Sequence, residues 1–105
     1  MAWKPLFASE KEALAATEKH LVYKKVDRKE LCIGQHKGKL FAIDDVCPHE
    51  GAPLSEGDLR ADGKVVCPFH FYLFDAFSGE CMGGLCDNVS TYSLKIEDDG
   101  VLIDL

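Results

Sequence analysis

The chain has 105 residues, of which 47% are apolar and 29% charged, and 12 basic against 18 acidic side chains leave a net charge of −6. This length suits one hydrophobic core, so we expect a single domain over residues 1–105. An acidic excess argues against nucleic-acid binding, for which a basic face is normal, and suits a partner with a basic surface.

The first twenty residues lack the apolar core of a secretory signal, because Lys4 and Pro5 interrupt it. No apolar run approaches the length needed to cross a bilayer. We therefore expect a cytoplasmic protein without a membrane partner. The five cysteines are an odd number, and in a reducing compartment a disulfide framework is not expected. Metal ligation is the first interpretation for any clustered subset.

Strand patterns alternate with turn signals from the N-terminus onwards, which is typical of a small all-β domain. Ser9 and Glu12 form a capping box that predicts one short helix over residues 9–18. Alternating or apolar runs predict strands over residues 3–8, 20–26, 30–36 and 39–44, the last three joined as hairpins by residues 27–29 and 37–38.

Glycine and proline interrupt the segment from residue 45 to about residue 75, where only residues 64–67 have strand character. Two loops are therefore expected to project from the β scaffold there. A further loop over residues 81–88 follows a turn at Gly79. Residues 91–97 and 101–105 are expected to close the chain as a hairpin.

Each projecting loop carries one cysteine and one histidine. The pattern is C-x-H at Cys47 and His49, then C-x-x-H at Cys67 and His70. Thiolates and imidazoles suit zinc or an iron–sulfur cluster, and a proline after each cysteine stiffens the loop. A lone cysteine is usually a small buried hydrophobe, but such compact pairing favours ligation.

Two metal centres fit these four residues. Structural zinc sites usually pair two cysteines on one knuckle and two histidines on a helix or second knuckle, whereas here each loop mixes the two. A mixed arrangement suits a dinuclear centre in which two cysteines hold one iron and two histidines hold the other. Zinc stays open as a structural module that mediates protein contacts, since the same donors bind it.

The stretches "CPHEGAPLSEG" and "VVCPFHFYLFDAFSGE" closely resemble the soluble Rieske-type [2Fe–2S] ferredoxins. The residues before the first loop and the closing hairpin also look like that family, so the resemblance leaves only the N-terminal helical turn without a match. It implies an antiparallel β-sandwich of three sheets with a cluster-binding subdomain at about residues 45–75.

The resemblance also implies the ligands and the role. Cys47 and Cys67 would ligate the inner iron, and His49 and His70 the outer iron near the protein tip. The chain would be a one-electron carrier without catalysis of its own, working between a flavin-dependent reductase and a terminal oxygenase such as a ring-hydroxylating dioxygenase. The histidines would form the docking face, within a ring made of Ala52, Pro53, Phe69 and Phe71.

Departures from the family refine these expectations. Respiratory and photosynthetic Rieske proteins join the two loops by a disulfide, but the matching positions are Ala52 and Phe69. Tyr72 and Phe74 stand where those proteins place a serine and a tyrosine that hydrogen-bond the cluster. Fewer such bonds predict a potential of roughly −150 mV, at the lower end of the Rieske range.

Phe71 stands where the family usually has glycine. Some small subunits of NAD(P)H-dependent nitrite reductases also carry a residue other than glycine there, so a role as such a subunit is the alternative function. Cys81 and Cys86 are not expected to be ligands or a disulfide, although Cys86 is a plausible neighbour of the cluster. Cys32, Trp3 and the phenylalanines of "FYLF" are expected to pack in the core. His20 and His36 are expected to be exposed.

Overall fold

The computed structural model describes residues 3–48, 51–69, 71–84, 86–98 and 100–105. The elements in chain order are β1 (Trp3–Phe7), α1 (Glu10–Ala16), β2 (Val22–Val26), β3 (Lys29–His36), β4 (Lys39–Asp44), η1 (Leu54–Glu56), β5 (Asp58–Leu59), β6 (Lys64–Val66), β7 (Leu73–Asp75), η2 (Met82–Gly84), β8 (Thr91–Tyr92), β9 (Leu94–Glu97) and β10 (Gly100–Asp104). Here η1 and η2 are short 3₁₀ turns.

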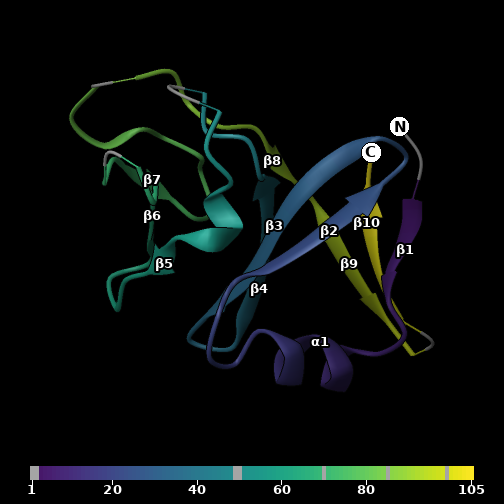
Figure 1. The fold of residues 1–105 in the computed structure, drawn as a ribbon. Coiled ribbons are helices and arrows are strands. Elements are labelled where there is room, and N and C mark those ends of the chain that lie inside the picture. The colour runs from purple at the N-terminus through teal and green to yellow at the C-terminus, as the bar shows by residue number, and fades with distance from the viewer. Residues whose placement is uncertain (1–2, 49–50, 70, 85, 99) are drawn as a thin grey trace.

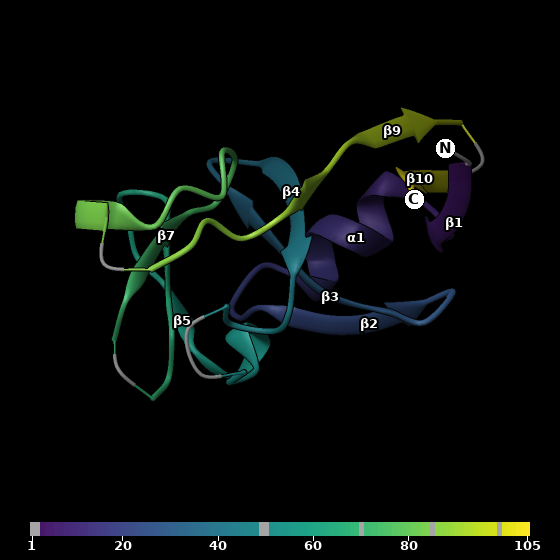
Figure 2. The same ribbon diagram turned by 90° about the horizontal axis from the view of Figure 1, so that it is seen from above.

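The strands form three antiparallel sheets, with the orders β1-β10-β9, β2-β3-β4-β8 and β5-β6-β7. Figures 1 and 2 place β5 and β7 at one end of the molecule and β1, β9 and β10 at the other, with the sheet that contains β3 and β4 between them. The expected all-β architecture of three antiparallel sheets is confirmed.

Two hairpins of the central sheet turn through residues with a left-handed backbone. Asp27 and Arg28 have φ values of 47° and 73° between β2 and β3, and Lys37 and Gly38 have values of 53° and 80° between β3 and β4. Two consecutive positive φ angles match the twist of the strands that such a turn joins. The two predicted hairpins are confirmed.

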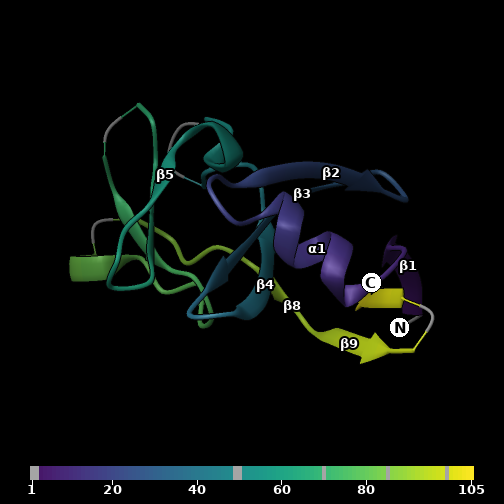
Figure 3. The same cartoon turned by 90° about the horizontal axis from the view of Figure 1, so that it is seen from below.

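The predicted capping box begins α1. The side chain of Ser9 accepts a hydrogen bond of 3.0 Å from the backbone N–H of Glu12, which satisfies one of the unpaired donors of the first turn. Gln35 of β3 then holds the other end of the helix, since its Nε2 donates to the carbonyl of Leu14 and to Thr17 Oγ1. Figure 3 shows α1 between β3 on one side and β1 and β10 on the other.

Strands β3 and β4 are buried on both faces. Successive side chains of a strand point to opposite faces, and the residues of β4 follow this rule: Leu40 and Ala42 belong to one apolar core, whereas Phe41 and Ile43 belong to another. The first core also contains Val101 and Ile103 of β10. The second core extends to β6, β7 and the loops that carry Cys47 and Cys67.

Three details differ from the predictions. The segment expected as one strand from residue 91 divides at Ser93, because β8 pairs with β4 whereas β9 pairs with β10. The strand expected over residues 64–67 ends at Val66, so Cys67 lies in a loop. Trp3 is not a core residue: it is 45% exposed, with Lys95 Nζ 5.5 Å from the centre of its ring.

No helix of the described segments is long and apolar enough to cross a membrane.

Candidate metal centre

Cys47 and Cys67 are brought into one buried environment. Cys47 follows β4 and is 1% exposed, while Cys67 follows β6 and is fully buried. Both side chains belong to the core between the central sheet and the β5-β6-β7 sheet, together with Leu54, Val65 and Phe74. One cysteine from each predicted loop therefore lies behind the same apolar layer.

The two loops repeat the same backbone hydrogen bonds. The N–H of Cys47 donates to the carbonyl of Ala52, and the N–H of Cys67 donates to that of Tyr72, both at 2.9 Å. A second bond returns to each cysteine carbonyl, from the N–H of Gly51 at 2.8 Å and from that of Phe71 at 3.0 Å. The residues flanking each loop also pair across it.

Those flanking pairs are Val46 with Pro53 in the first loop and Val66 with Leu73 in the second. Because both loops start from a Val-Cys-Pro run, the two cysteine side chains leave equivalent points of equivalent loops. The near-repeat in the sequence is therefore a repeated backbone structure. The fifth position of each loop has a left-handed backbone, with φ of 74° at Gly51 and 58° at Phe71.

Asp45 holds the exit of the first loop against its entry. Its side chain is 3% exposed, and its Oδ1 accepts a hydrogen bond of 2.7 Å from the N–H of Ser55. Its backbone carbonyl accepts the N–H of Leu54 at 2.6 Å, and its own N–H donates to the carbonyl of Glu30 at 2.9 Å. Sequence reasoning missed this residue, although an aspartate directly before a glycine- and proline-rich loop is a common signal of local capping.

A third segment covers this core. Cys81 is 2% exposed, and it forms an isolated β-bridge with Phe74, which is completely buried. Cys86 is half-buried and packs on the same core as Cys47 and Cys67. The expected burial of Cys32 is also confirmed, since its side chain is fully buried in β3.

The two described members of the donor set, Cys47 and Cys67, fit an iron–sulfur centre. Two buried thiols on matched loops can hold one iron, since thiolates are the protein ligands that such clusters use. His49 and His70 lie outside the described residues. Within the described ranges no group of three or more metal-binding side chains comes together, as expected when two of four candidate ligands lie outside them.

The expected docking ring is only partly at the surface. Phe69 is 62% exposed and Phe71 is 71% exposed, and Pro53 is half-buried. The prediction was wrong for Ala52, which is 1% exposed and packs beneath the first loop. The separate prediction that the phenylalanines of "FYLF" pack in the core was wrong for Phe71 and is confirmed for Phe74. Val46, 45% exposed, was missed.

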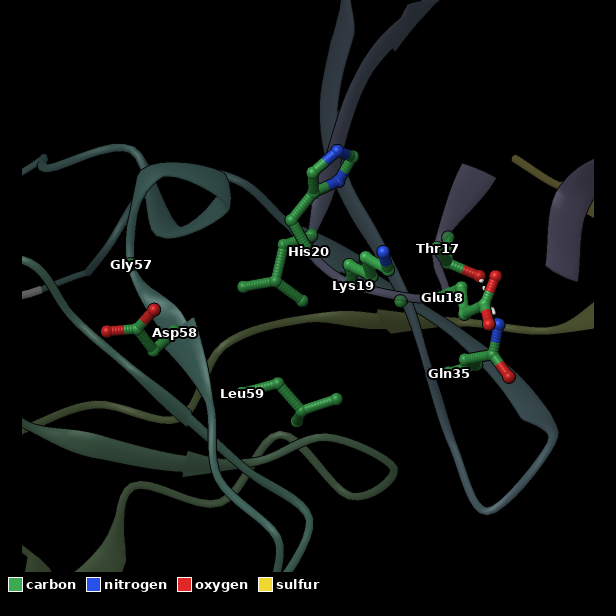
Figure 4. Close-up of a pocket in the computed structure, with 10 residues that line it drawn as sticks. Thr17, Glu18, Lys19, His20, Gln35, Gly57, Asp58 and Leu59 are labelled. Atoms are coloured by element: carbon green, nitrogen blue, oxygen red, sulfur yellow. Dashed lines mark hydrogen bonds between the residues drawn. The ribbon is translucent and has the colours of Figure 1, made fainter. Parts of the chain in front are cut away.

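A pocket of 170 Å³ lies where the β5-β6-β7 sheet meets the body of the protein. It is lined by residues 17–21 after α1, by Gly34 and Gln35 of β3, and by residues 57–59. Figure 4 shows the bond from Gln35 to Thr17 on one side and Leu59 on the other. Among the described residues, neither Cys47 nor Cys67 lines it. His20 on its rim is exposed as expected, whereas His36 is only partly exposed.

Comparison with known proteins agrees with this geometry. The model of the Rieske [2Fe-2S] domain matches residues 3–93. The chain is 36% identical over 81 residues to the ferredoxin component of the naphthalene 1,2-dioxygenase system of Pseudomonas aeruginosa, which covers 76% of this chain and 77% of that protein. It is 39% identical over 72 residues to the 3-phenylpropionate/cinnamic acid dioxygenase ferredoxin subunit of Shigella flexneri, covering 65% of each.

Solved structures share the fold. A ferredoxin of Sphingomonas yanoikuyae B1 matches with a TM-score of 0.80 and 27% identity over 97% of this chain and 99% of that one. A second match is a chain in a complex of reduced oxygenase and oxidised ferredoxin in carbazole 1,9a-dioxygenase, with a TM-score of 0.80 over 96% of this chain and 100% of that one. At 21% identity, this match is evidence of the fold alone. The expectation that the N-terminal helical turn has no counterpart is wrong, because the family match begins at residue 3.

Proposed function

The chain belongs to the Rieske [2Fe-2S] domain family and carries one Rieske-type [2Fe–2S] cluster, and from this premise we propose that it is a one-electron carrier that connects a flavin-dependent reductase to a terminal oxygenase. The observation that carries the proposal is the pair of matched loops that each place one cysteine in the same buried core. The named relatives are ferredoxin components of dioxygenase systems, not catalytic subunits.

The proposed ligands are Cys47 and Cys67 for one iron and His49 and His70 for the other. When bound, the cluster supplies a single reversible one-electron step. The chain's own contribution is to hold two thiolates in a dry environment, bounded by Phe74 and Leu54, which are both fully buried. We propose that residues 45–75 form the cluster-binding subdomain of one domain over residues 1–105.

Spectroscopy of the purified holoprotein tests the proposal. We expect the electron paramagnetic resonance spectrum of the reduced protein to be that of a Rieske centre, with iron and sulfide in equal amounts. A colourless protein that contains zinc and no sulfide would instead favour the structural zinc module. The purified protein thus separates two different classes of function without knowledge of the partner.

Ligand variants test the four residues one at a time. His49→Ala and His70→Ala are expected to abolish the Rieske spectrum, as are Cys47→Ala and Cys67→Ala. His20→Ala is the matched control, because His20 is an exposed histidine of the α1–β2 connection, outside the two loops. An unchanged spectrum in either ligand histidine variant would refute the assignment.

The partner surface is proposed to include the exposed side chains of both loops and a groove beside the first one. Phe69 and Phe71 offer apolar contact. The groove, of 410 Å³, is lined by Tyr23, Glu30, Asp45, Pro53, Ser55 and Glu56. Its two exposed carboxylates, Glu30 and Glu56, suit a basic partner surface, in keeping with the net charge of −6.

Stopped-flow reduction of a terminal oxygenase tests that surface, beginning with the oxygenase of the naphthalene 1,2-dioxygenase system. Glu56→Gln is expected to lower the association rate at low ionic strength several-fold, with the difference shrinking as salt screens the charges. Glu12→Gln in α1 makes the same charge change away from the groove and is expected to leave the rate close to that of the unaltered protein.

The alternative role as a small subunit of a nitrite reductase gains no support from the relatives named above, and an oxygenase system is therefore the partner that we propose. A cytoplasmic location is part of the proposal. Fractionation of cells that produce the tagged chain would test it, with the activities of the partner reductase and of the partner oxygenase followed in the same fractions.

A further inference from the structure

Cys81 and Cys86 form a thiol pair that the proposed electron-carrier function does not use. The two residues flank the η2 turn in the segment that covers the core behind the cluster loops. Both are free cysteines, and Cys81 lies close enough to Cys86 to be, after burial, one of the causes that raise its pKa. From the sequence, no bond between them was expected.

The backbone turns sharply directly after Cys81. Gly83 and Gly84 have φ values of 76° and 64°, which glycine adopts without the strain of a side chain. The N–H of Gly84 returns to the carbonyl of Cys81 at 3.2 Å, and the N–H of Cys81 donates to Asn88 Oδ1 at 3.0 Å. Cys81 is thus held in place through both its carbonyl and its N–H, at the start of the turn that leads to Cys86.

The two thiols differ in accessibility. Cys86 is half-buried, whereas Cys81 is 2% exposed and packs in the core. A small reagent can therefore reach Cys86 first, and Cys81 is positioned to react only with its neighbour. This division of roles is what an attacking and a resolving cysteine require.

We propose that Cys81 and Cys86 are a site of oxidative modification, at which exchange with a low-molecular-weight disulfide such as oxidised glutathione forms an intramolecular disulfide. The thiolate of Cys86 attacks one sulfur of the reagent, which releases one glutathione thiolate and leaves a mixed disulfide. The thiolate of Cys81 then attacks the sulfur of Cys86 and releases the second glutathione. The two protons lost by the cysteines go to the released thiolates, and the two electrons go to the reagent disulfide.

The surroundings make this exchange slow. Cys86 is half-buried and Cys81 is 2% exposed, so the reagent seldom reaches a thiolate that can attack it. The test therefore uses a long incubation.

The holoprotein is incubated without oxygen with oxidised glutathione, then denatured, alkylated and digested for mass spectrometry. The expected product is a peptide with Cys81 and Cys86 linked and its mass lower by two hydrogens, while Cys32 is fully alkylated. Recovery of both Cys81 and Cys86 in alkylated form would overturn the proposal. A stable glutathione adduct on Cys86 would also overturn it, because Cys81 would then not resolve the mixed disulfide.

Variants assign the two roles. Cys86→Ser is expected to prevent both the link and the adduct, and Cys81→Ala to leave glutathione on Cys86. Cys32→Ala is the matched control, since Cys32 is another buried thiol and its loss is expected to leave the link unchanged. If Cys81→Ala does not fold, the half-buried Cys86→Ser still decides the outcome. The visible spectrum, followed in the same sample, reports the cluster separately, so failure of the proposed function is distinguishable from failure of the disulfide.

Discussion

Gly51 and Phe71 occupy the same position in two loops of the same hydrogen-bonded backbone. The N–H of each donates to the carbonyl of the cysteine four residues earlier, and each has a left-handed conformation. At Gly51 this backbone is free of strain, and a β carbon there would meet no atom within 4 Å. At Phe71 a bulky residue adopts the same conformation although its side chain is mostly exposed, which is uncommon for such a residue.

Phe71→Gly is expected to stabilise the protein. The left-handed conformation costs a residue with a side chain about 1–2 kcal/mol, and the extra freedom of glycine in the unfolded chain offsets part of this gain. Because the Phe71 side chain is 71% exposed, little packing is lost. We expect a net gain of up to about 1 kcal/mol in urea unfolding of the holoprotein.

Gly51→Ala is the matched variant at the equivalent position. With open space around its β carbon, it is expected to lose about 1 kcal/mol for conformational reasons alone. A destabilised Phe71→Gly would contradict the equivalence of the two loops. If Phe71 contacts the oxygenase as proposed, Phe71→Gly also slows electron transfer to it, so that stability and rate change in opposite directions.

Gly57→Ala is expected to disrupt the junction between the two loops. A β carbon at Gly57 would lie 1.8 Å from the carbonyl oxygen of Val66, the residue before Cys67. The φ of Gly57 is −86°, which any residue adopts, so the conflict is purely one of space. Forced backbone shifts of this kind cost at least about 1–3 kcal/mol. Thermal unfolding and iron content measure the effect, and both are expected to fall.

Asp58→Ala next to it adds no atom at this contact and serves as the control. Wild-type iron content in Gly57→Ala would mean that β5 and β6 can separate without disturbing either loop. That outcome would contradict the close approach that we describe.

Phe74 is expected to keep the potential low. It is fully buried, pairs with Val65 in the β6–β7 hairpin and contacts Cys81 across a β-bridge, and its ring has no hydroxyl to donate to sulfur. Redox titration is expected to give roughly −150 mV. Phe74→Tyr is expected to shift the potential in the positive direction, because a hydrogen bond to sulfur stabilises the reduced cluster.

Phe77→Tyr provides the comparison, since Phe77 is 38% exposed and its ring packs on Phe41. It is expected to leave the potential unchanged. A clearly positive potential for the unaltered protein would defeat this explanation, as would a negative shift in Phe74→Tyr.

Asp75 at the end of β7 is expected to contribute to stability in acid. The backbone N–H of Ser78 donates a hydrogen bond to this carboxyl and is the main cause that lowers its pKa below 3.8. Partial burial raises the pKa and so opposes this effect, while the backbone N–H of Phe77 and the ammonium group of Lys64 lower the pKa further. A group with a lowered pKa in the folded state stabilises the fold above its unfolded pKa, and this contribution is lost as pH falls through the folded pKa. Acid unfolding should therefore depend on this residue.

Asp75→Asn is expected to lower stability at neutral pH and to flatten the loss of stability below about pH 4. Lys64→Gln removes only the ion pair, whose atoms lie 3.3 Å apart, and is expected to have the smaller effect of the two. Identical acid limbs for Asp75→Asn and the unaltered protein in pH-dependent urea unfolding would contradict the prediction.

Local sequence was sufficient for the elements that local forces form. The capping box at Ser9, the turns at residues 27–28 and 37–38, and the period-two pattern of residues 40–43 each correspond to an observed element. The short strands β5 and β7 were not predicted. They contain only two and three residues, too few for a pattern, and they exist because β6 supplies their hydrogen bonds.

The candidate ligands could be read from residue types and spacing, because thiolate and imidazole chemistry depends on what the side chains are. Their surroundings depended on the fold. Nothing local distinguishes Ala52, which is buried, from Phe71, which is exposed, since burial depends on which distant segment covers a residue. The same holds for Cys81 and Cys86, which pack on one core that distant segments supply.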